Sequence, residues 1–89
     1  MKMKKTEKIG DVRVRGIHFV IIRRWNEEMT VTDYVLSMKW CEPGKDGRMV
    51  NKQHIIGKYN YLKEALNKLY YMVEIASWQS ADELIIINQ

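Results

Sequence analysis

Hydrophobic and polar residues alternate along several stretches of the chain, a pattern of period two that predicts β-strands. The first alternation begins at Val12, is interrupted at Gly16 and continues to Arg24. A bulge at Gly16 would keep the aliphatic and aromatic side chains on one face, because one extra residue restores the alternation. The first strand is therefore predicted to carry these residues inward: Val12, Val14, Ile17, Phe19 and Ile21.

Two further strands follow, each preceded by a polar stretch. The residues from Asn26 to Thr30 predict a hairpin turn, after which a second strand runs from Val31 or Thr32 to Cys41. The stretch from Glu42 to Arg48 contains the only proline and two of the five glycines, so it predicts a loop. A third strand is expected at roughly Lys52 to Tyr59, with Gly57 allowing a bulky side chain to approach the end of that strand.

The period changes after Tyr59, where leucines begin to recur every three or four residues. This spacing predicts an amphipathic helix with Asn60 as its N-cap. Its main apolar face consists of Leu62, Leu66, Leu69, Val73 and Ala76. A second stripe indicates that the helix has another contact, either the C-terminal segment or a partner subunit; it consists of Tyr61, Tyr71, Ile75 and Trp78.

The C-terminal run Leu84 to Ile87 has high β propensity and no alternation, which favours a short strand. That strand would lie either inside the sheet or at an exposed edge where a second chain pairs with it. The predicted fold class is α+β: a three-stranded antiparallel meander packed on one long α-helix, with a short C-terminal strand. Residues 1–10 are predicted to be a flexible basic arm and residues 11–89 a single domain.

The charge is unevenly distributed along the chain. The 89 residues carry a formal charge of +4, and no Lys or Arg follows Lys68. A basic N-terminal part favours polyanionic partners without specifying one. No apolar run approaches the ~20 residues needed to span a bilayer, and the start lacks a secretory signal, so we expect a cytoplasmic protein without a membrane partner. The single cysteine, Cys41, cannot form an internal disulfide.

Catalytic and metal-binding patterns are not found in the sequence. The candidate ligands His18, Cys41 and His54 have none of the spacings that are typical of zinc sites. No serine lies in a nucleophile-elbow pattern, and no glycine-rich phosphate loop precedes a helix. We therefore expect no enzymatic activity, no cofactor and no metal.

The outward face of the predicted sheet combines cations with aliphatic residues. Its polar members are Arg13, Arg15, His18, Arg24, Ser37, Lys39, His54 and Lys58. Its aliphatic members are Val20, Ile22, Val35 and Ile56. Such a face suits nucleic acid, where Arg and Lys contact phosphates or guanine edges, and it also suits a protein interface with a charged rim. A third possibility is that the arm or the C-terminal run covers the aliphatic residues within one subunit.

The run from Ile56 to Leu66, IGKYNYLKEAL, resembles a strand-to-helix junction found in two families of small DNA-binding domains. These are the domains of plant ethylene-response transcription factors and the N-terminal domains of tyrosine integrases from mobile elements. The matching residues are Gly57, Tyr59, Glu64 and Ala65. The resemblance implies a sheet that lies in the major groove and reads DNA with Arg, Lys and Trp side chains.

Two functional hypotheses follow from the sequence. The first is a small non-catalytic accessory or regulatory protein that binds nucleic acid, with DNA favoured over RNA. Its binding residues would be Arg13, Arg15, Arg24, Lys39 and Lys58, together with Lys4 and Lys5 of the arm. The second is a protein-binding module or inhibitor from a phage or mobile element, which would act as a single chain or as a homodimer. Its interface would consist of Val20, Ile22, Val35, Ile56, Trp78 and Ile86.

Overall fold

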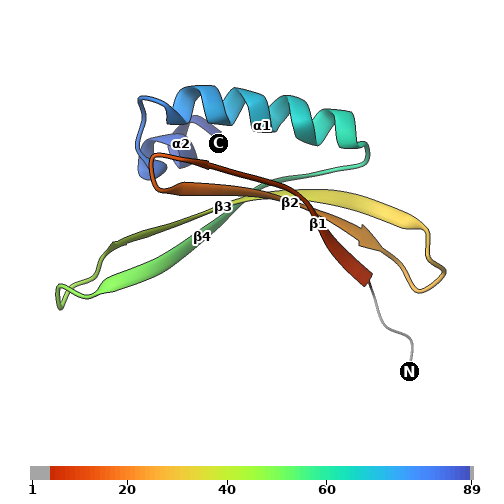
Figure 1. Cartoon of the computed structure of the whole chain (residues 1–89), viewed down its shortest axis with the longest axis horizontal. Helices are drawn as coiled ribbons and strands as arrows, with labels where there is room; N and C mark the ends of the chain where they lie inside the picture. The colour runs from red at the N-terminus through yellow and green to blue at the C-terminus, as the bar shows by residue number, and fades with distance from the viewer. Residues whose placement is uncertain (1–4, 89) are drawn as a thin grey trace.

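The computed structural model describes Lys5 to Asn88 and consists of four strands followed by two helices (Figure 1). The strands are β1 (Lys5–Val14), β2 (Ile17–Trp25), β3 (Val31–Pro43) and β4 (Met49–Tyr59). The helices are α1 (Leu62–Ala76) and α2 (Ala81–Asn88). The strands form one antiparallel sheet in the order β1-β2-β3-β4, so every strand pairs with its neighbour in the sequence.

The α+β class is correct, but the predicted arrangement of three strands on one long helix is wrong, because the sheet has four strands. The difference arises at Arg15 and Gly16, which both have positive φ, 50° and 83°. Two successive residues of this kind form a tight hairpin turn, so Gly16 reverses the chain instead of adding a bulge to one strand. Val14 consequently pairs with Ile17 across the turn.

The predicted flexible arm overlaps β1. Lys5 to Gly10 belong to this strand and pair with β2, where Lys5 lies opposite Trp25. Residues 1–4 of the predicted arm lie outside the described residues. The edge strand therefore begins well before Val12, where the hydrophobic alternation begins.

The two predicted loops between the remaining strands do connect antiparallel strands. The Asn26 side chain accepts hydrogen bonds from the backbone N–H groups of Glu28 and Thr30, at 2.9 and 3.0 Å. These bonds hold the reversal between β2 and β3. In the second loop, the N–H of Gly44 donates to the carbonyl of Arg48 at 2.7 Å. Both β3 and β4 begin or end a few residues beyond their predicted bounds.

Helix α1 begins one residue later than the sequence predicted. Its N-cap is Tyr61, in an extended conformation and without a side-chain cap hydrogen bond, so the prediction that Asn60 caps the helix is wrong. The buried face also differs from the predicted one: it includes Ala65 and Met72, which were in neither predicted stripe, and Ile75 from the second stripe. Its buried residues are Ala65, Leu69, Met72, Ile75 and Ala76.

The predicted C-terminal strand is a helix, α2. Ser80 and Glu83 form reciprocal hydrogen bonds at its start: the N–H of Glu83 donates to Ser80 Oγ, and the N–H of Ser80 donates to a Glu83 carboxylate oxygen, both at 3.3 Å. This is the capping box expected when Ser and Glu lie three residues apart. The start of the helix is thus stabilised despite the high β propensity of the residues that follow.

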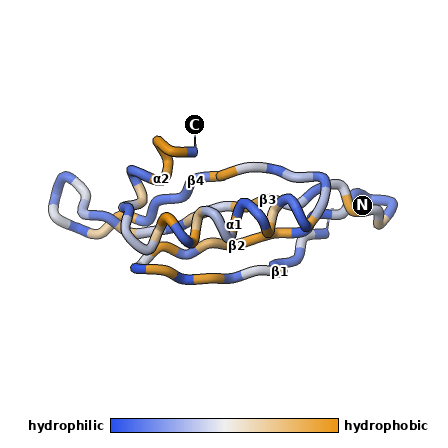
Figure 2. Tube along the Cα trace, turned by 90° about the horizontal axis from the view of Figure 1, so that it is seen from above, coloured by the Kyte–Doolittle hydropathy of each residue, from blue (hydrophilic) through white to orange (hydrophobic). Residues whose placement is uncertain are grey.

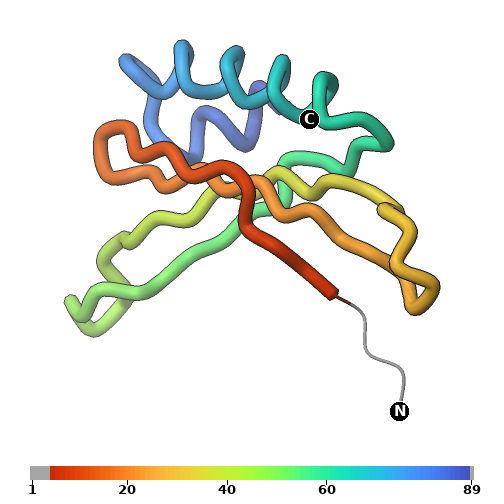
Figure 3. Tube along the Cα trace, turned by 45° about the vertical axis from the view of Figure 1, so that its right-hand side comes forward, coloured from red at the N-terminus to blue at the C-terminus, as the bar shows by residue number. Residues whose placement is uncertain are grey.

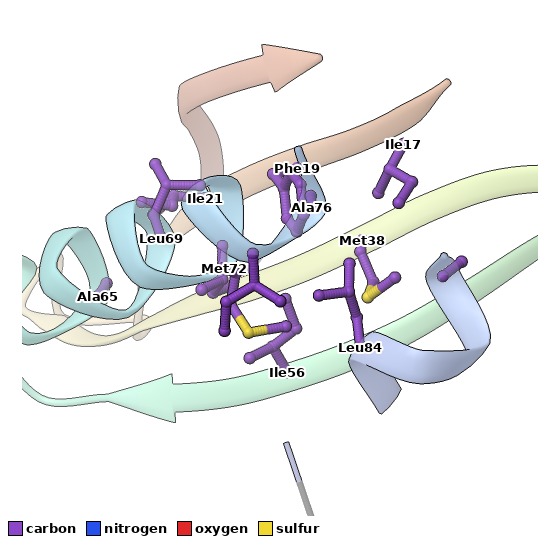
Figure 4. Close-up of a cluster of buried hydrophobic side chains, with 13 residues drawn as sticks. Ile17, Phe19, Ile21, Met38, Ile56, Ala65, Leu69, Met72, Ala76 and Leu84 are labelled. Carbon is purple, nitrogen blue, oxygen red and sulfur yellow. The ribbon is translucent and has the colours of Figure 1, made fainter. Parts of the chain in front are cut away.

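The core lies between the helices and one face of the sheet (Figure 4). Phe19, Ile21, Leu36, Met38, Met72 and Leu84 are the largest fully buried side chains. They come from the two central strands and both helices, so the sheet and the helical layer meet in one cluster. Burying side chains of this size contributes roughly 1.5–3 kcal/mol each before the cost of ordering them.

A bulge in β4 decides which residues of this strand reach the core. Gly57 lies opposite Leu36, and Ile55 lies opposite Ser37, so Ile56 is an additional residue in β4. Ile56 is consequently buried among the core residues, and Ile55 is 50 % exposed on the other face. The predicted outward position of Ile56 is therefore wrong. A Cβ at Gly57 would lie 2.6 Å from Tyr59 Oη, so a bulky side chain does approach this glycine.

The sheet is curved, and both helices cover the same side of it (Figure 1). Figure 3 shows the two ends of the sheet bending away from the helices, so the opposite face lies on the inside of the arch. We call this concave, helix-free surface the open face. None of the helices within residues 5–88 is both long and apolar enough to cross a membrane.

Substituting Gly16 tests whether positive φ in the first turn stabilises the four-stranded fold. Gly16→Val is expected to lower the free energy of unfolding by about 1–3 kcal/mol, because a β-branched residue resists this conformation. Gly16→Asn should lose much less, since asparagine tolerates the left-handed region. A Cβ at this position meets no atom within 4 Å, so a steric clash of the Cβ does not contribute to the loss of stability in either variant. Urea unfolding monitored by circular dichroism measures the free energy of unfolding of both variants. Equal losses in the two variants would contradict the view that positive φ at this position matters for stability.

Candidate nucleic-acid interface

The open face carries side chains in rows that cross the sheet, because residues paired between antiparallel strands point to the same side. The first row contains Arg13, His18, Lys39 and Gln53, one from each strand. The next row contains Asp11, Val20, Ser37 and Ile55. The third contains Lys8, Ile22, Val35 and Lys58, and the last pairs Thr6, Arg24 and Asp33.

The first row lines a cleft of about 700 Å³. Arg13, His18, Lys39 and Gln53 all contribute to its walls, together with Cys41 and Asn51, which pair two residues farther along β3 and β4. Neighbouring strands lie roughly 4.8 Å apart, so the row extends over about 14 Å. Along this distance the cleft offers cationic groups and an amide that donate hydrogen bonds.

Two aspartates neutralise part of the positive charge on the open face. Asp11 is hydrogen-bonded to Lys8 Nζ at 2.8 Å and to His18 Nε2. The bond from Lys8, and after it the bond from His18, lower the pKa of the Asp11 carboxyl below its ordinary value. Lys8 and His18 are therefore held by a carboxylate inside the same face.

Arg24 and Asp33 form the second neutralised group. Arg24 Nε donates to Asp33 Oδ1 at 2.6 Å, and Nη2 donates to Oδ2, which makes the pair bidentate. This bonding to Arg24 is the main cause that lowers the pKa of Asp33, and Lys58 adds a weaker attraction. Arg24 is therefore on the predicted face but is engaged with a carboxylate.

Three cations of the open face are left for a ligand. Arg13, Lys39 and Lys58 are exposed and form no ion pair with any residue between Lys5 and Asn88. Each was predicted from the sequence, and the structure places them on one face from three different strands. An exposed cation without a carboxylate partner keeps its full charge for a phosphate group.

The other predicted binding residues lie elsewhere. Arg15 is in the first turn and donates from Nη1 to the carbonyl of Ala76 at 3.4 Å, at the end of α1. Its predicted position on the outward face is therefore wrong, and the bond favours a role in holding the helix end. Lys5 lies over the Trp25 ring on the helix side, with Nζ 4.8 Å from the ring centroid. Lys4 lies outside the described residues.

His54 was also expected to point outward, but it pairs with Met38, a core residue, and so faces the helix side. The bulge at Ile56 explains this error, because the residues before and after it have opposite alternation. In exchange, Gln53 and Asn51 join the open face, although the sequence-based interpretation did not single them out. To predict these two positions from the sequence, one would have to assume a bulge at Ile56 and count the alternation of faces from there toward Met49.

The aliphatic residues proposed for a protein interface are also separated. Val20 is on the open face but only 3 % exposed, and Ile56 is in the core. Ile22 and Val35 are half-buried in the third row. Trp78 and Ile86 are exposed, at 58 % and 69 %, but they belong to the helical layer and not to the open face. The predicted residues therefore do not form one surface.

His, Cys, Asp and Glu side chains within residues 5–88 do not form a group of three that could hold a metal ion. Cys41 is exposed, and its Sγ lies 3.0 Å from Asn51 Oδ1. The cleft therefore offers hydrogen-bonding and cationic groups as its main chemistry. No protein-family model, curated protein or solved structure matches this chain.

Replacing Arg24 tests the electrostatic balance of the open face. In Arg24→Gln, the pKa of Asp33, followed by carboxyl carbon chemical shifts, should rise toward its ordinary value. The folded-state pKa of Asp33 lies below its unfolded-state value. The ion pair therefore stabilises the fold fully above the unfolded-state pKa, and this stabilisation is lost as the pH falls through the folded-state pKa.

Acid unfolding of Arg24→Gln should accordingly show a weaker pH dependence in that range than the wild type. Lys8→Gln is the matched control for the Asp33 titration: it should raise the pKa of Asp11, whose main partner it removes, and leave the pKa of Asp33 unchanged, because the pair of Arg24 and Asp33 stays intact. An unchanged Asp33 titration in Arg24→Gln would contradict the assignment of Arg24 as its main partner.

Proposed function

We propose that this chain is a small, non-catalytic nucleic-acid-binding protein that receives the phosphate backbone on its open face. The observation that carries the proposal is the set of three exposed cations that form no ion pair among the described residues, Arg13, Lys39 and Lys58, on one concave, helix-free surface. Phosphate contacts supply most of the affinity in nucleic-acid binding without requiring a specific sequence.

The distribution of partners on the open face supports this choice of ligand. Asp11 and Asp33 are each bonded to cations that lie on the same face, so the carboxylates do not confront a phosphate as free negative charges. The neutralised groups flank the aliphatic centre made by Val20, Ile22 and Val35. A polyanion can therefore contact the three remaining cations at little electrostatic cost.

The open face also indicates how the ligand would be held. Its four rows contain no Phe, Tyr or Trp side chain, and the Phe, Tyr and Trp residues of β2 and β3 belong to the opposite face, although Trp40 also contributes to the cleft. Base stacking on aromatic rings is a principal means of holding single strands without sequence preference. Contacts to the phosphate backbone suit a duplex better than a single strand, and Gln53 and Asn51 can contact the base edges of a duplex. Duplex DNA is therefore the form to test first.

The salt dependence of binding provides a quantitative test. Three phosphate contacts predict a slope of log K against log salt of about −2.7 for duplex DNA. Arg13→Gln and Lys39→Gln should each reduce the magnitude of that slope by about 0.9 and weaken binding to all sequences alike. Fluorescence anisotropy with a labelled mixed-sequence duplex, titrated at several salt concentrations, measures both quantities.

Lys63→Gln is the matched control, because it removes one exposed positive charge from α1, on the other side of the sheet. Its slope should equal that of the wild type. If Arg13→Gln and Lys39→Gln behave like Lys63→Gln, the charge of the protein attracts DNA only in a general way and the open face is not the binding surface.

A further inference from the structure

The cleft of the open face lies at a step in the sheet. β3 pairs with β4 as far as Pro43, but it pairs with β2 only as far as Lys39, which lies opposite His18. Residues 40–43 therefore have a paired strand on one side only. Figure 2 shows the hairpin of β3 and β4 extending beyond the turn that joins β1 to β2.

This recess is large enough for a small organic ligand. Its volume of about 700 Å³ falls within the roughly 300–1,000 Å³ of pockets that hold such ligands. Gly16, Ile17, Trp40 and Cys41 line the cleft and also a second hollow of about 260 Å³, which reaches Ser80. The recess thus continues around the free side of β3 toward the connection between the two helices.

Trp40 gives the cleft a planar aromatic wall. Its indole Nε1 donates to Glu42 Oε2 at 3.1 Å, and Glu42 Oε1 lies 3.7 Å from Lys52 Nζ. The indole ring is half-buried and packs against the core, so contacts on two sides fix its orientation. A fixed aromatic ring beside an open recess is suited to stacking with a planar ligand.

The charge of the walls favours an anion. None of the described residues that line the cleft is an Asp or a Glu. His18 and Lys52 have carboxylate partners that lie outside the lining. Arg13 and Lys39 form no ion pair with any described residue, so they are the two cations that can bind an anionic group in the cleft.

Two amide side chains add hydrogen-bonding groups. Asn51 and Gln53 lie two residues apart on β4, so they point to the same face of the sheet. Asn51 Oδ1 accepts from Cys41 Sγ at 3.0 Å, which leaves the Nδ2 group of Asn51 as a donor for another partner. Amide side chains supply the donors and acceptors that recognise the edge of a nucleobase.

We propose that the cleft binds one unpaired nucleotide, with its base between Trp40 and the amides of Asn51 and Gln53 and its phosphate at Arg13 and Lys39. Unstacked bases are held in this way, by an aromatic ring against one face and hydrogen bonds to the edge. An acidic peptide would use the cations and the amides but not the aromatic wall. The inference rests on the proposed function, because phosphate contacts along the open face bring the strand to the cleft.

Titration with thymidine 5′-monophosphate, followed by NMR, tests the site without a duplex. The indole signal of Trp40 and the side-chain amide signals of Asn51 and Gln53 should shift and saturate together. The indole signals of Trp25 and Trp78, which line neither hollow, should stay in place. The proposal is overturned if the Trp40 signal shows no saturable shift, or if inorganic phosphate or a glutamate peptide shifts it equally.

Two duplexes of the same mixed sequence, one blunt and one with a single unpaired 3′ thymidine, extend the test to a strand. Fluorescence anisotropy should show the wild type binding the second duplex at least about fivefold more tightly, because a stacked base adds to the phosphate contacts. Trp40→Leu should bring this ratio to about one. Trp78→Leu is the matched control, since Trp78 is 58 % exposed outside the cleft, and it should keep the wild-type ratio.

The results distinguish the nucleotide site from the proposed function. Equal affinity of the wild type for both duplexes, with the predicted salt slope, would overturn the nucleotide site and leave the open face as a binding surface. Saturable binding of the mononucleotide by a chain that binds neither duplex would support the site and contradict the proposed function. If Trp40→Leu does not fold, Gln53→Ala replaces an exposed side chain instead, and unchanged mononucleotide affinity in that variant would count against the site.

Discussion

Burial of one sheet face beneath the helices is the contact on which the rest of this structure depends. Phe19, Leu36, Met38 and Met72 have no exposed surface, and they connect the two central strands to α1. Side chains alternate along each strand, so a residue committed to the core forces its neighbours to the other face. The position of Phe19 and Met38 in the core thus places His18 and Lys39 together on the open face.

The same alternation explains why single inserted residues have large effects. Ile56 enters the core as the extra residue of a bulge, and every residue of β4 on its N-terminal side changes face relative to a regular strand. Gln53 consequently continues the row of Arg13 and Lys39, and His54 is turned toward the helix side. A similar shift between Lys8 and Gly10 in β1 places Lys8 beside Ile22. Both edge strands thus owe their contribution to the open face to a break in regular pairing.

The electrostatic character of the open face depends on which cations find carboxylates. Arg24 has a bidentate partner in Asp33, and Lys8 and His18 share Asp11. An ion pair at a surface contributes little to stability, but it removes both charges from competition for a ligand. The ability of the open face to attract a polyanion therefore depends on Arg13, Lys39 and Lys58, although the face contains additional basic residues.

The sequence by itself determined the α+β class, the hairpins at Asn26 and at Gly44, and the amphipathic character of α1, because each depends on local turn chemistry or on a period within one segment. It also identified Arg13, Lys39 and Lys58 as members of one face. The prediction of a C-terminal strand rested on the β propensity of Leu84 to Ile87, whereas the capping box of Ser80 and Glu83 starts a helix there. Only the tertiary structure decided that Gly16 ends one strand and begins another, that Ile56 turns inward, and that Arg15 holds the end of α1. The physical reason is that these outcomes depend on strand pairing and on contacts between residues far apart in the chain, whereas hydrophobic alternation reports only the side to which neighbouring residues point.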